Sequence, residues 1–188
     1  MSATTSTNLP SKASTLKIIE VLSVVFSLIY TWTYIQGHSW CFIFGGLGAL
    51  GFVYLCWLKR IYAESALQLF YVGFAIYGYL NTSDEWLVLH HSWLDNMPYL
   101  LTSILGTALL GFGLKRFSNA AAPYLDAFTT VFSLVATVLM VNFIHENWLY
   151  WMVIDAVSAL LYLKRKLYFG AVLFVIYFFL AIYGFING

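Results

Sequence analysis

The residues whose types and spacing best suit the binding of a ligand lie in Asn147–Asp155. This stretch is part of an apolar run that continues to Leu163. In a helix, Trp148, Trp151 and Asp155 fall at i, i+3 and i+7, so two indole rings and a carboxylate share one face. Asp155 then lies about eight residues, or roughly 12 Å, from the start of the segment, near the middle of a membrane core about 30 Å thick. A carboxylate at that depth costs roughly 2.5–3.5 kcal/mol unless it faces a cavity or a partner. A cavity with indole walls and one negative charge suits a small, flat, cationic ligand.

The composition indicates a polytopic, all-α membrane protein. Of the 188 residues, 62% are hydrophobic and only 9% are charged, with a mean hydropathy of +0.82. A water-soluble domain needs far more charge to cover its surface. The net charge of +1 gives no reason to expect nucleic acid as a partner.

The two cysteines and the histidines give no sign of a disulfide or a metal site. Cys41 and Cys56 lie fifteen residues apart in one expected helix, roughly 22 Å along its axis, so they cannot bridge each other. His90 and His91 are adjacent, point apart and lack further ligands. We therefore predict neither a metal nor a cofactor.

Seven apolar segments are long enough to be membrane helices, and the long stretch Asn81–Pro98 separates two of them. Residues 1–16 are polar, and we expect them to form a disordered cytoplasmic tail. The chain then divides into this tail, a three-helix bundle in 17–81, an outer loop and linker helix in 82–122, and a second three-helix bundle in 123–188. The expected helices are 17–36, 40–58, 61–81, 98–114, 123–143, 147–163 and 166–186.

The placement of positive charge supports this count and predicts an orientation. If all seven segments cross the membrane, every Lys and Arg falls on the side of the N-terminus. The opposite loops carry acidic residues and histidines, among them Asp84, Asp95 and Glu146. The positive-inside rule then places the N-terminus in the cytoplasm and the C-terminus outside. The nine basic residues are Lys12, Lys17, Lys59, Arg60, Lys115, Arg116, Lys164, Arg165 and Lys166.

The sequence also contains an internal repeat. A shift of 106 residues aligns Leu58–Asn81 with Lys164–Asn187 without a gap, with eight identities in 24 positions. The longest shared run is Ala-Ile-Tyr-Gly, at Ala75–Gly78 and Ala181–Gly184. Because a single helix lies between the two copies, both copies point the same way through the membrane. Such a 3+1+3 parallel duplication is typical of transporters that hold a substrate between their halves.

The sequence resembles the PnuC family of bacterial vitamin transporters, whose best-known members carry nicotinamide riboside. The resemblance is strongest at Pro123–Thr130, Ser133 and Glu146–Trp148, followed by Trp151 and Asp155, which complete a Trp-x-x-Trp-x-x-x-Asp/Asn signature. It implies a SWEET-like 3+1+3 fold, usually a homotrimer, in the bacterial inner membrane. It also implies facilitated diffusion of the vitamin, which a cytoplasmic kinase then phosphorylates and traps.

Two departures from the riboside-carrying members bear on the substrate. Gly78–Asn81 replaces an aromatic-rich end of the third helix, and Gly48 stands where some members have Asn. The loss of a polar group weakens recognition of a ribose diol. A branch of the family that resembles this shorter pattern carries thiamine, which also has a flat cationic ring. We therefore predict thiamine as the substrate, with nicotinamide riboside as the alternative.

The candidate substrate-binding residues also have plainer interpretations. Trp148 has the alternative of an interfacial belt residue, like Trp40, and Asp155 that of a protonated, hydrogen-bonded structural residue. Gln68 and Tyr71 match the family's third helix, but polar residues of this kind also hold helices together. The candidate set is Trp148, Trp151, Asp155, Gln68, Tyr71, Asn147, Thr130 and Ser133.

Other function classes fit the residues less well than a passive carrier. The sequence has no Gly-x-x-x-x-Gly-Lys-Ser/Thr phosphate loop for ATP hydrolysis, whereas ion coupling through Asp155 stays open. An intramembrane enzyme needs a nucleophile and a base at depth, and apart from Asp155 the mid-membrane positions have no His, Cys pair or second carboxylate. A retinal receptor needs a Lys in its last helix, and residues 167–188 contain none. A sugar carrier of the SWEET type would not call for an acidic residue.

Overall fold

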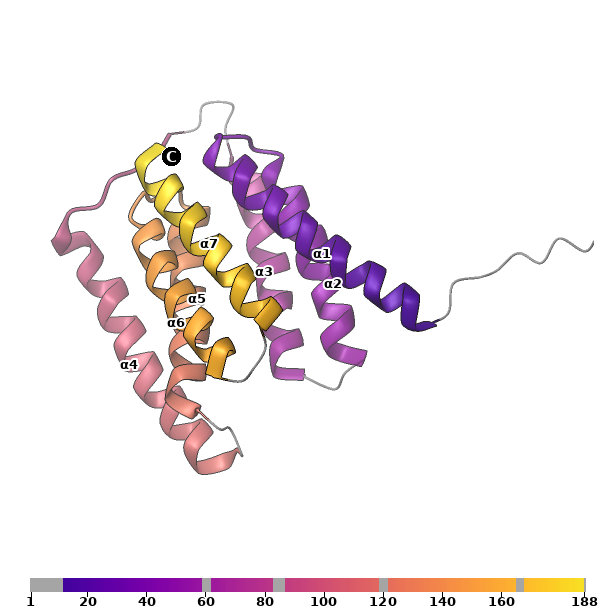
Figure 1. Cartoon of the computed structure of the whole chain (residues 1–188). Helices are drawn as coiled ribbons and strands as arrows, with labels where there is room; N and C mark the ends of the chain where they lie inside the picture. Colours follow the sequence, from indigo (N-terminus) through magenta and orange to yellow (C-terminus); the bar gives the residue numbers. More distant parts are fainter. Residues whose placement is uncertain (1–11, 59–61, 83–86, 119–121, 165–167, 188) are drawn as a thin grey trace, which may run out of the picture.

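The protein is all-helical (Figure 1). The computed structural model describes residues 12–58, 62–82, 87–118, 122–164 and 168–187. Apolar runs of 18 to 25 residues form continuous helices, because a helix satisfies its own backbone polar groups without water. The helices are α1 (Lys12–Ile35), α2 (Cys41–Leu58), α3 (Tyr62–Asn81), α4 (Trp93–Phe117), α5 (Pro123–Val141), α6 (Asn147–Lys164) and α7 (Tyr168–Asn187).

The first helix begins earlier than predicted. It includes residues 12–16, which were assigned to the polar tail, so that boundary is wrong by five residues. Lys12, Ala13 and Leu16 are good helix formers, and nothing between Pro10 and the apolar run interrupts a helix. The rest of the predicted tail, residues 1–11, lies outside the described residues.

Helix α4 is also longer than the predicted 98–114. Ser92 caps its first turn: its hydroxyl lies 2.7 Å from the carboxylate of Asp95, and that carboxylate accepts the Ser92 backbone N–H at 3.0 Å. Pro98 therefore lies in the second turn rather than at the start. The prediction gave too much weight to proline as a helix start and missed the Ser-x-x-Asp capping pattern. The other five helices begin and end within two residues of the predicted bounds.

Among the residues that the structure describes, four helices are long and apolar enough to cross a membrane by themselves: residues Ser14–Ile35 of α1, and α2, α4 and α5. A shorter apolar stretch, Ala171–Asn187, forms most of α7. Helix α6 is not among the four, since Asn147, Asp155 and Lys164 lower its hydropathy. The all-helical membrane class is therefore confirmed, while length and composition alone support four of the seven predicted crossings.

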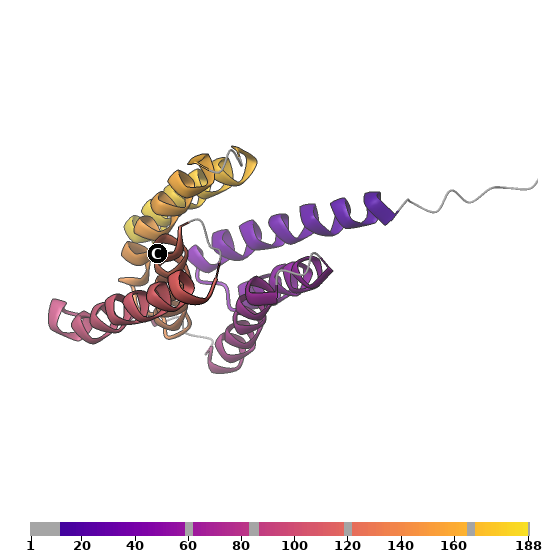
Figure 2. The ribbon, with the colours of Figure 1, turned by 90° about the horizontal axis from the view of Figure 1, so that it is seen from below.

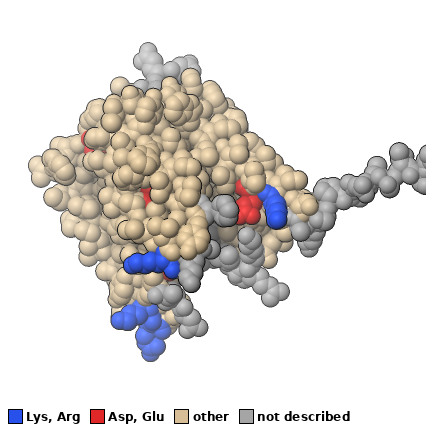
Figure 3. All heavy atoms as spheres, viewed as in Figure 1, with Lys and Arg blue, Asp and Glu red and all other residues tan. Residues whose placement is uncertain are grey.

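Few charged side chains lie on the face of the molecule shown in Figure 3. On the face shown, the Lys and Arg side chains lie toward the lower end and at the start of α1, and the upper end, where α1 and α7 finish in Figure 1, has none. Large apolar side chains such as Leu109, Phe179 and Ile186 are exposed. Such a surface suits contact with lipid rather than water.

The helices pack as two sets of three with α4 attached to the second. Helix α2 packs against both α1 and α3, and α6 packs against both α5 and α7. Within the described residues, α4 packs only against α5. The two sets meet through α3 with α5 and α1 with α7. In Figure 2, α1 lies between the α2–α3 pair and the α6–α7 pair.

The 106-residue shift relates the helix boundaries of the two sets, well beyond the segment in which the sequence showed it. It relates Cys41 to Asn147 and Leu58 to Lys164, which are the first and last residues of α2 and α6. It also relates the ends of α1 and α5, and both ends of α3 and α7. The same shift exchanges the α1–α7 contact for the α5–α3 contact.

The turns that follow α1 and α5 have the same backbone geometry. Gly37 and Phe143 have positive φ angles of 72° and 57°, and within the described parts of the chain no other residue does. Each donates its N–H to the carbonyl three residues earlier at 3.0 Å, Gly37 to Tyr34 and Phe143 to Met140. A phenylalanine in this conformation is uncommon, so a comparison of the residue types at these two turns does not predict that their backbones match.

Close helix packing at equivalent glycines yields a stability prediction. A Cβ at Gly184 would lie 2.7 Å from the indole of Trp148, and one at Gly78 would overlap the ring of Phe42, its counterpart in the first set. We expect Gly184→Ala to destabilise the fold by about 1–3 kcal/mol, because the buried indole must shift. The measurement is the thermal unfolding midpoint of the purified protein in detergent.

Gly73→Ala in α3 is the matched control, because nothing lies within 4 Å of a Cβ there. Alanine favours a helix over glycine by about 1 kcal/mol, so this variant should be neutral or slightly more stable. Equal unfolding midpoints for the two variants would contradict the prediction.

Candidate functional site

Asp155 lies in the middle of α6, and only 4% of it is exposed. Within the described residues, no cation pairs with the carboxylate and no hydrogen bond to it is found. A buried membrane carboxylate without a counter-ion is costly and typically has a functional role.

The two tryptophans of α6 have different surroundings. Trp148 is only 3% exposed, and its ring packs edge-on against Tyr34 with centroids 5.6 Å apart. It belongs to a buried cluster with Cys41, Phe42 and other residues of both sets. Trp151 is partly buried against the same cluster, and its Nε1 is buried with no hydrogen-bond partner in the described residues. Trp148 is thus part of the core, whereas Trp151 retains an unused donor.

The candidate residues outside α6 lie on the neighbouring helices α5 and α3. Ser133 is buried, and its carbonyl accepts the Thr137 hydroxyl at 2.7 Å. The Thr130 hydroxyl donates to the carbonyl of Asp126 at 2.8 Å, so it is satisfied within its own helix. Gln68 and Tyr71 are half-buried on α3, which packs against α5.

A pocket with a volume of about 220 Å³ lies at the end of the molecule where α1 ends and α6 begins. It brings together Asn147 and Trp148 from the candidate set but includes neither Trp151 nor Asp155. Asn147 is 1% exposed, and its side-chain N–H donates to the Ile144 carbonyl at 2.6 Å, which ties α6 to the preceding turn. The lining residues are Tyr34, Ile35, Gln36, Gly37, Val88, Phe143, His145, Asn147 and Trp148.

Sequence reasoning missed most of this lining, because it comes from turns and from the segment before α4. The available signal was indirect. The 106-residue shift places the turns after α1 and α5 at the same end of the molecule, where their residues can share one pocket.

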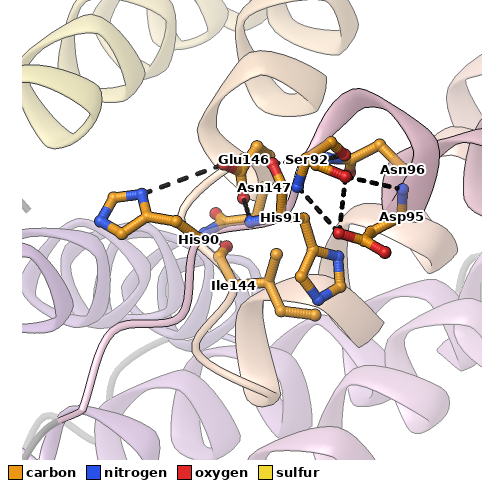
Figure 4. A network of polar contacts seen from close by, with 8 residues as sticks. All are labelled: His90, His91, Ser92, Asp95, Asn96, Ile144, Glu146 and Asn147. Atoms are coloured by element: carbon orange, nitrogen blue, oxygen red, sulfur yellow. Dashed lines mark hydrogen bonds and ion pairs between the residues drawn. The ribbon is translucent and has the colours of Figure 1, made fainter.

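The segment between α3 and α4, here called the strap (residues 87–92), is attached to the turn between α5 and α6 (Figure 4). Leu89 donates its N–H to the Phe143 carbonyl and accepts the N–H of His145, both at 2.8 Å, opposite Ile144. Val88 of the strap lines the pocket. The strap therefore covers one side of the pocket and is bonded to the second set of helices.

Glu146 reinforces this attachment through its carboxylate. One oxygen accepts the His91 backbone N–H at 2.9 Å, and the other lies 3.9 Å from Nδ1 of His90, an ion pair when that ring is protonated. Within the described parts of the chain, no three His, Cys, Asp or Glu side chains are placed to hold a metal ion. His90 and His91 therefore contribute to the attachment of the strap through Glu146.

Removing this carboxylate should loosen the strap. We expect Glu146→Ala to increase hydrogen–deuterium exchange at the amides of Leu89 and His91, since a charge-assisted bond is worth about 1.5–3 kcal/mol. The amide of Asp126, bonded to Ala122 at 2.9 Å in the first turn of α5, is the internal reference. Unchanged exchange at Leu89 and His91 would show that the backbone bridge alone holds the strap.

Comparison with known proteins decides what kind of protein this is. Residues 17–187 match a family described as nicotinamide mononucleotide transporters. The chain belongs to this family. The predicted resemblance to PnuC transporters is thereby confirmed, and the protein is a membrane transporter and not an enzyme.

A solved structure of this family has the same fold. It is described as the crystal structure of the vitamin B3 transporter PnuC. The two chains are 22% identical, with a TM-score of 0.74 over 91% of this chain and 80% of that one. At this identity the likeness shows that this chain shares the fold of that transporter.

Proposed function

We propose that this PnuC-family transporter carries a small cationic vitamin, with thiamine as the leading candidate. One observation carries the proposal: Asp155 is buried in α6 without a counter-ion in the described residues, one turn from the partly buried indole of Trp151. A thiazolium ring would supply the missing positive charge and stack against the indole. Gln68, Tyr71, Thr130 and Ser133 are the proposed polar contacts from α3 and α5, and Asn147 and Trp148 border the approach to the site.

Nicotinamide riboside is the second candidate. Its pyridinium ring is also flat and cationic, so Asp155 and Trp151 suit either ligand. The solved relative is described as a vitamin B3 transporter, which favours a nicotinamide compound. Against it, Gly48 stands where some riboside carriers have Asn, and Gly78–Asn81 keeps only Tyr79 where such carriers have an aromatic-rich helix end.

Titration of the purified protein with each vitamin, followed by quenching of its tryptophan fluorescence, separates the two candidates. We expect saturable quenching by thiamine at lower concentration than by nicotinamide riboside. The reverse order would make the riboside the substrate, and no quenching by either would reject the proposed function.

The proposed mechanism uses the two helix sets as moving halves. We infer a 3+1+3 parallel, SWEET-like arrangement in which α1–α3 and α5–α7 rock about the ligand and α4 links them, with the N-terminus cytoplasmic and the C-terminus outside. The matching boundaries of the two sets and their paired contacts support this arrangement. A homotrimer in the bacterial inner membrane and trapping of the vitamin by a cytoplasmic kinase complete the proposal.

Transport in proteoliposomes tests the passive mechanism. We expect labelled thiamine to accumulate by counterflow into vesicles loaded with unlabelled thiamine, at the same rate with and without proton or sodium gradients. Uptake that stops when a gradient is removed would show ion coupling, for which Asp155 would be the first residue to examine.

A further inference from the structure

The two halves of the molecule, α1–α3 and α5–α7, have equivalent helix bounds but carry different side chains at the proposed site. With the 106-residue shift, Asp155 corresponds to Ala49 and Trp151 to Gly45 of α2. Ala49 is buried, as Asp155 is. The acid and the indole are therefore contributed by the second half alone, and a ligand held by them meets different chemistry on its other side.

In the first half, an aromatic ring from another helix lies beside Gly45, the position equivalent to Trp151. The ring of Tyr30 in α1 lies against Gly45, where an added Cβ would be 3.0 Å from it. The counterpart of Tyr30 in the second half is Ala136, which has no ring. Tyr30 and Trp151 both pack against the same buried cluster. One ring thus comes from the first helix of the first half, and the other from the second helix of the second half.

The two rings also lie at the same level along the helices. Tyr34 of α1 and Trp148 of α6 are in direct contact, with ring centroids 5.6 Å apart, so these two residues mark one level. Tyr30 is four residues, roughly 6 Å, before Tyr34 in α1, and Trp151 is three residues, roughly 4.5 Å, after Trp148 in α6. Because α1 ends where α6 begins, both steps lead in the same direction, away from the pocket that Tyr34 and Trp148 line.

Both rings carry a hydrogen-bond donor that is poorly satisfied. Nε1 of Trp151 is buried and has no partner in the described residues. The hydroxyl of Tyr30 donates to the thioether sulfur of Met140 at 3.4 Å, and a thioether is a weak acceptor. Buried donors normally have an oxygen or nitrogen acceptor, so this level lacks an acceptor group.

We propose that Tyr30 and Trp151 form a donor pair that binds an acceptor atom of the ligand one turn above Asp155, which makes Tyr30 a specificity-determining residue. The inference rests on the proposed function. It specifies the ligand class further: a cationic ring joined to a second group with nitrogen or oxygen acceptors. In thiamine these acceptors are the pyrimidine nitrogens, and in nicotinamide riboside they are the ribose oxygens.

The test uses Tyr30→Phe with two probes that share the cation. One probe is thiamine, and the other is 3-benzyl-5-(2-hydroxyethyl)-4-methylthiazolium, which has a phenyl ring in place of the aminopyrimidine. We expect Tyr30→Phe to weaken thiamine binding by roughly 3- to 10-fold, the scale of one hydrogen bond, and to leave binding of the benzyl probe unchanged. The unfolding midpoint should not change, because the ring and its packing are kept.

Tyr54→Phe is the matched control, since Tyr54 is half exposed on α2 and should affect neither probe. If Tyr30→Phe weakens both probes equally, or neither, the donor pair is wrong. If instead Asp155→Ala leaves binding of both probes unchanged, the proposed function fails. Should nicotinamide riboside be the ligand, 1-methylnicotinamide, which keeps the cation and lacks the ribose, replaces the benzyl probe with the same expectation.

Discussion

Replacing Asp155 with alanine is expected to weaken vitamin binding by about 1–3 kcal/mol, or roughly 5- to 150-fold in Kd. The carboxylate is buried and has no counter-ion in the described residues, so the ligand's positive charge is the group that it lacks. The measurement is the Kd from fluorescence titration, together with the initial rate of counterflow in proteoliposomes.

Two further variants separate charge from shape in this experiment. Asp155→Asn keeps the size of the side chain and removes its charge, so it should resemble the alanine variant. Glu20→Gln removes an exposed carboxylate of α1 and should change nothing. The unfolding midpoint should not fall in Asp155→Ala, since an uncompensated buried charge is itself unfavourable. Unaltered affinity in both Asp155 variants would remove this residue from the site.

Replacing Trp151 with alanine is expected to weaken binding by about 2 kcal/mol, the scale of a desolvated cation–π contact. The same change removes part of the tryptophan fluorescence, so the affinity is better measured by isothermal titration calorimetry. Because Trp151 packs against the buried cluster, this variant should also be less stable.

Trp151→Phe keeps an aromatic ring, so comparing it with Trp151→Ala separates the effect of lost packing from that of the lost indole. It should recover most of the stability and part of the affinity. Trp93→Ala at the start of α4, where the side chain is 84% exposed, should leave binding unchanged. If Trp151→Ala and Trp93→Ala bind the vitamin equally well, the indole of α6 does not form a wall of the site.

Much of the fold could be predicted from the sequence because a membrane imposes a simple rule. Backbone polar groups in lipid must be satisfied within a helix, so an apolar run of sufficient length predicts a helix with few alternatives. Five of the helices accordingly lie within two residues of their predicted bounds. The errors occur where local capping decides, at Lys12 and at Ser92, because hydropathy does not register a helix that extends into polar residues.

The chemistry of α6 was also present in the sequence. Helical spacing alone places Trp148, Trp151 and Asp155 on one face, and all three lie in a single helix of the structure. Their separate surroundings could not be predicted. Trp148 is a core residue because Gly184, far along the chain, leaves room for its ring.

The sequence by itself determined the class of the protein, most helix bounds, and the acid and indoles that its proposed ligand would meet. Tertiary structure alone decided which turns form the pocket, that the strap is bonded to the second set, and that Tyr30 and Trp151 pack against the same buried cluster. The physical reason is the separation along the chain over which a sequence pattern carries information. Periodicity and hydropathy report on neighbours within a few turns of one helix, whereas a pocket between two halves depends on how helices separated by about a hundred residues pack together.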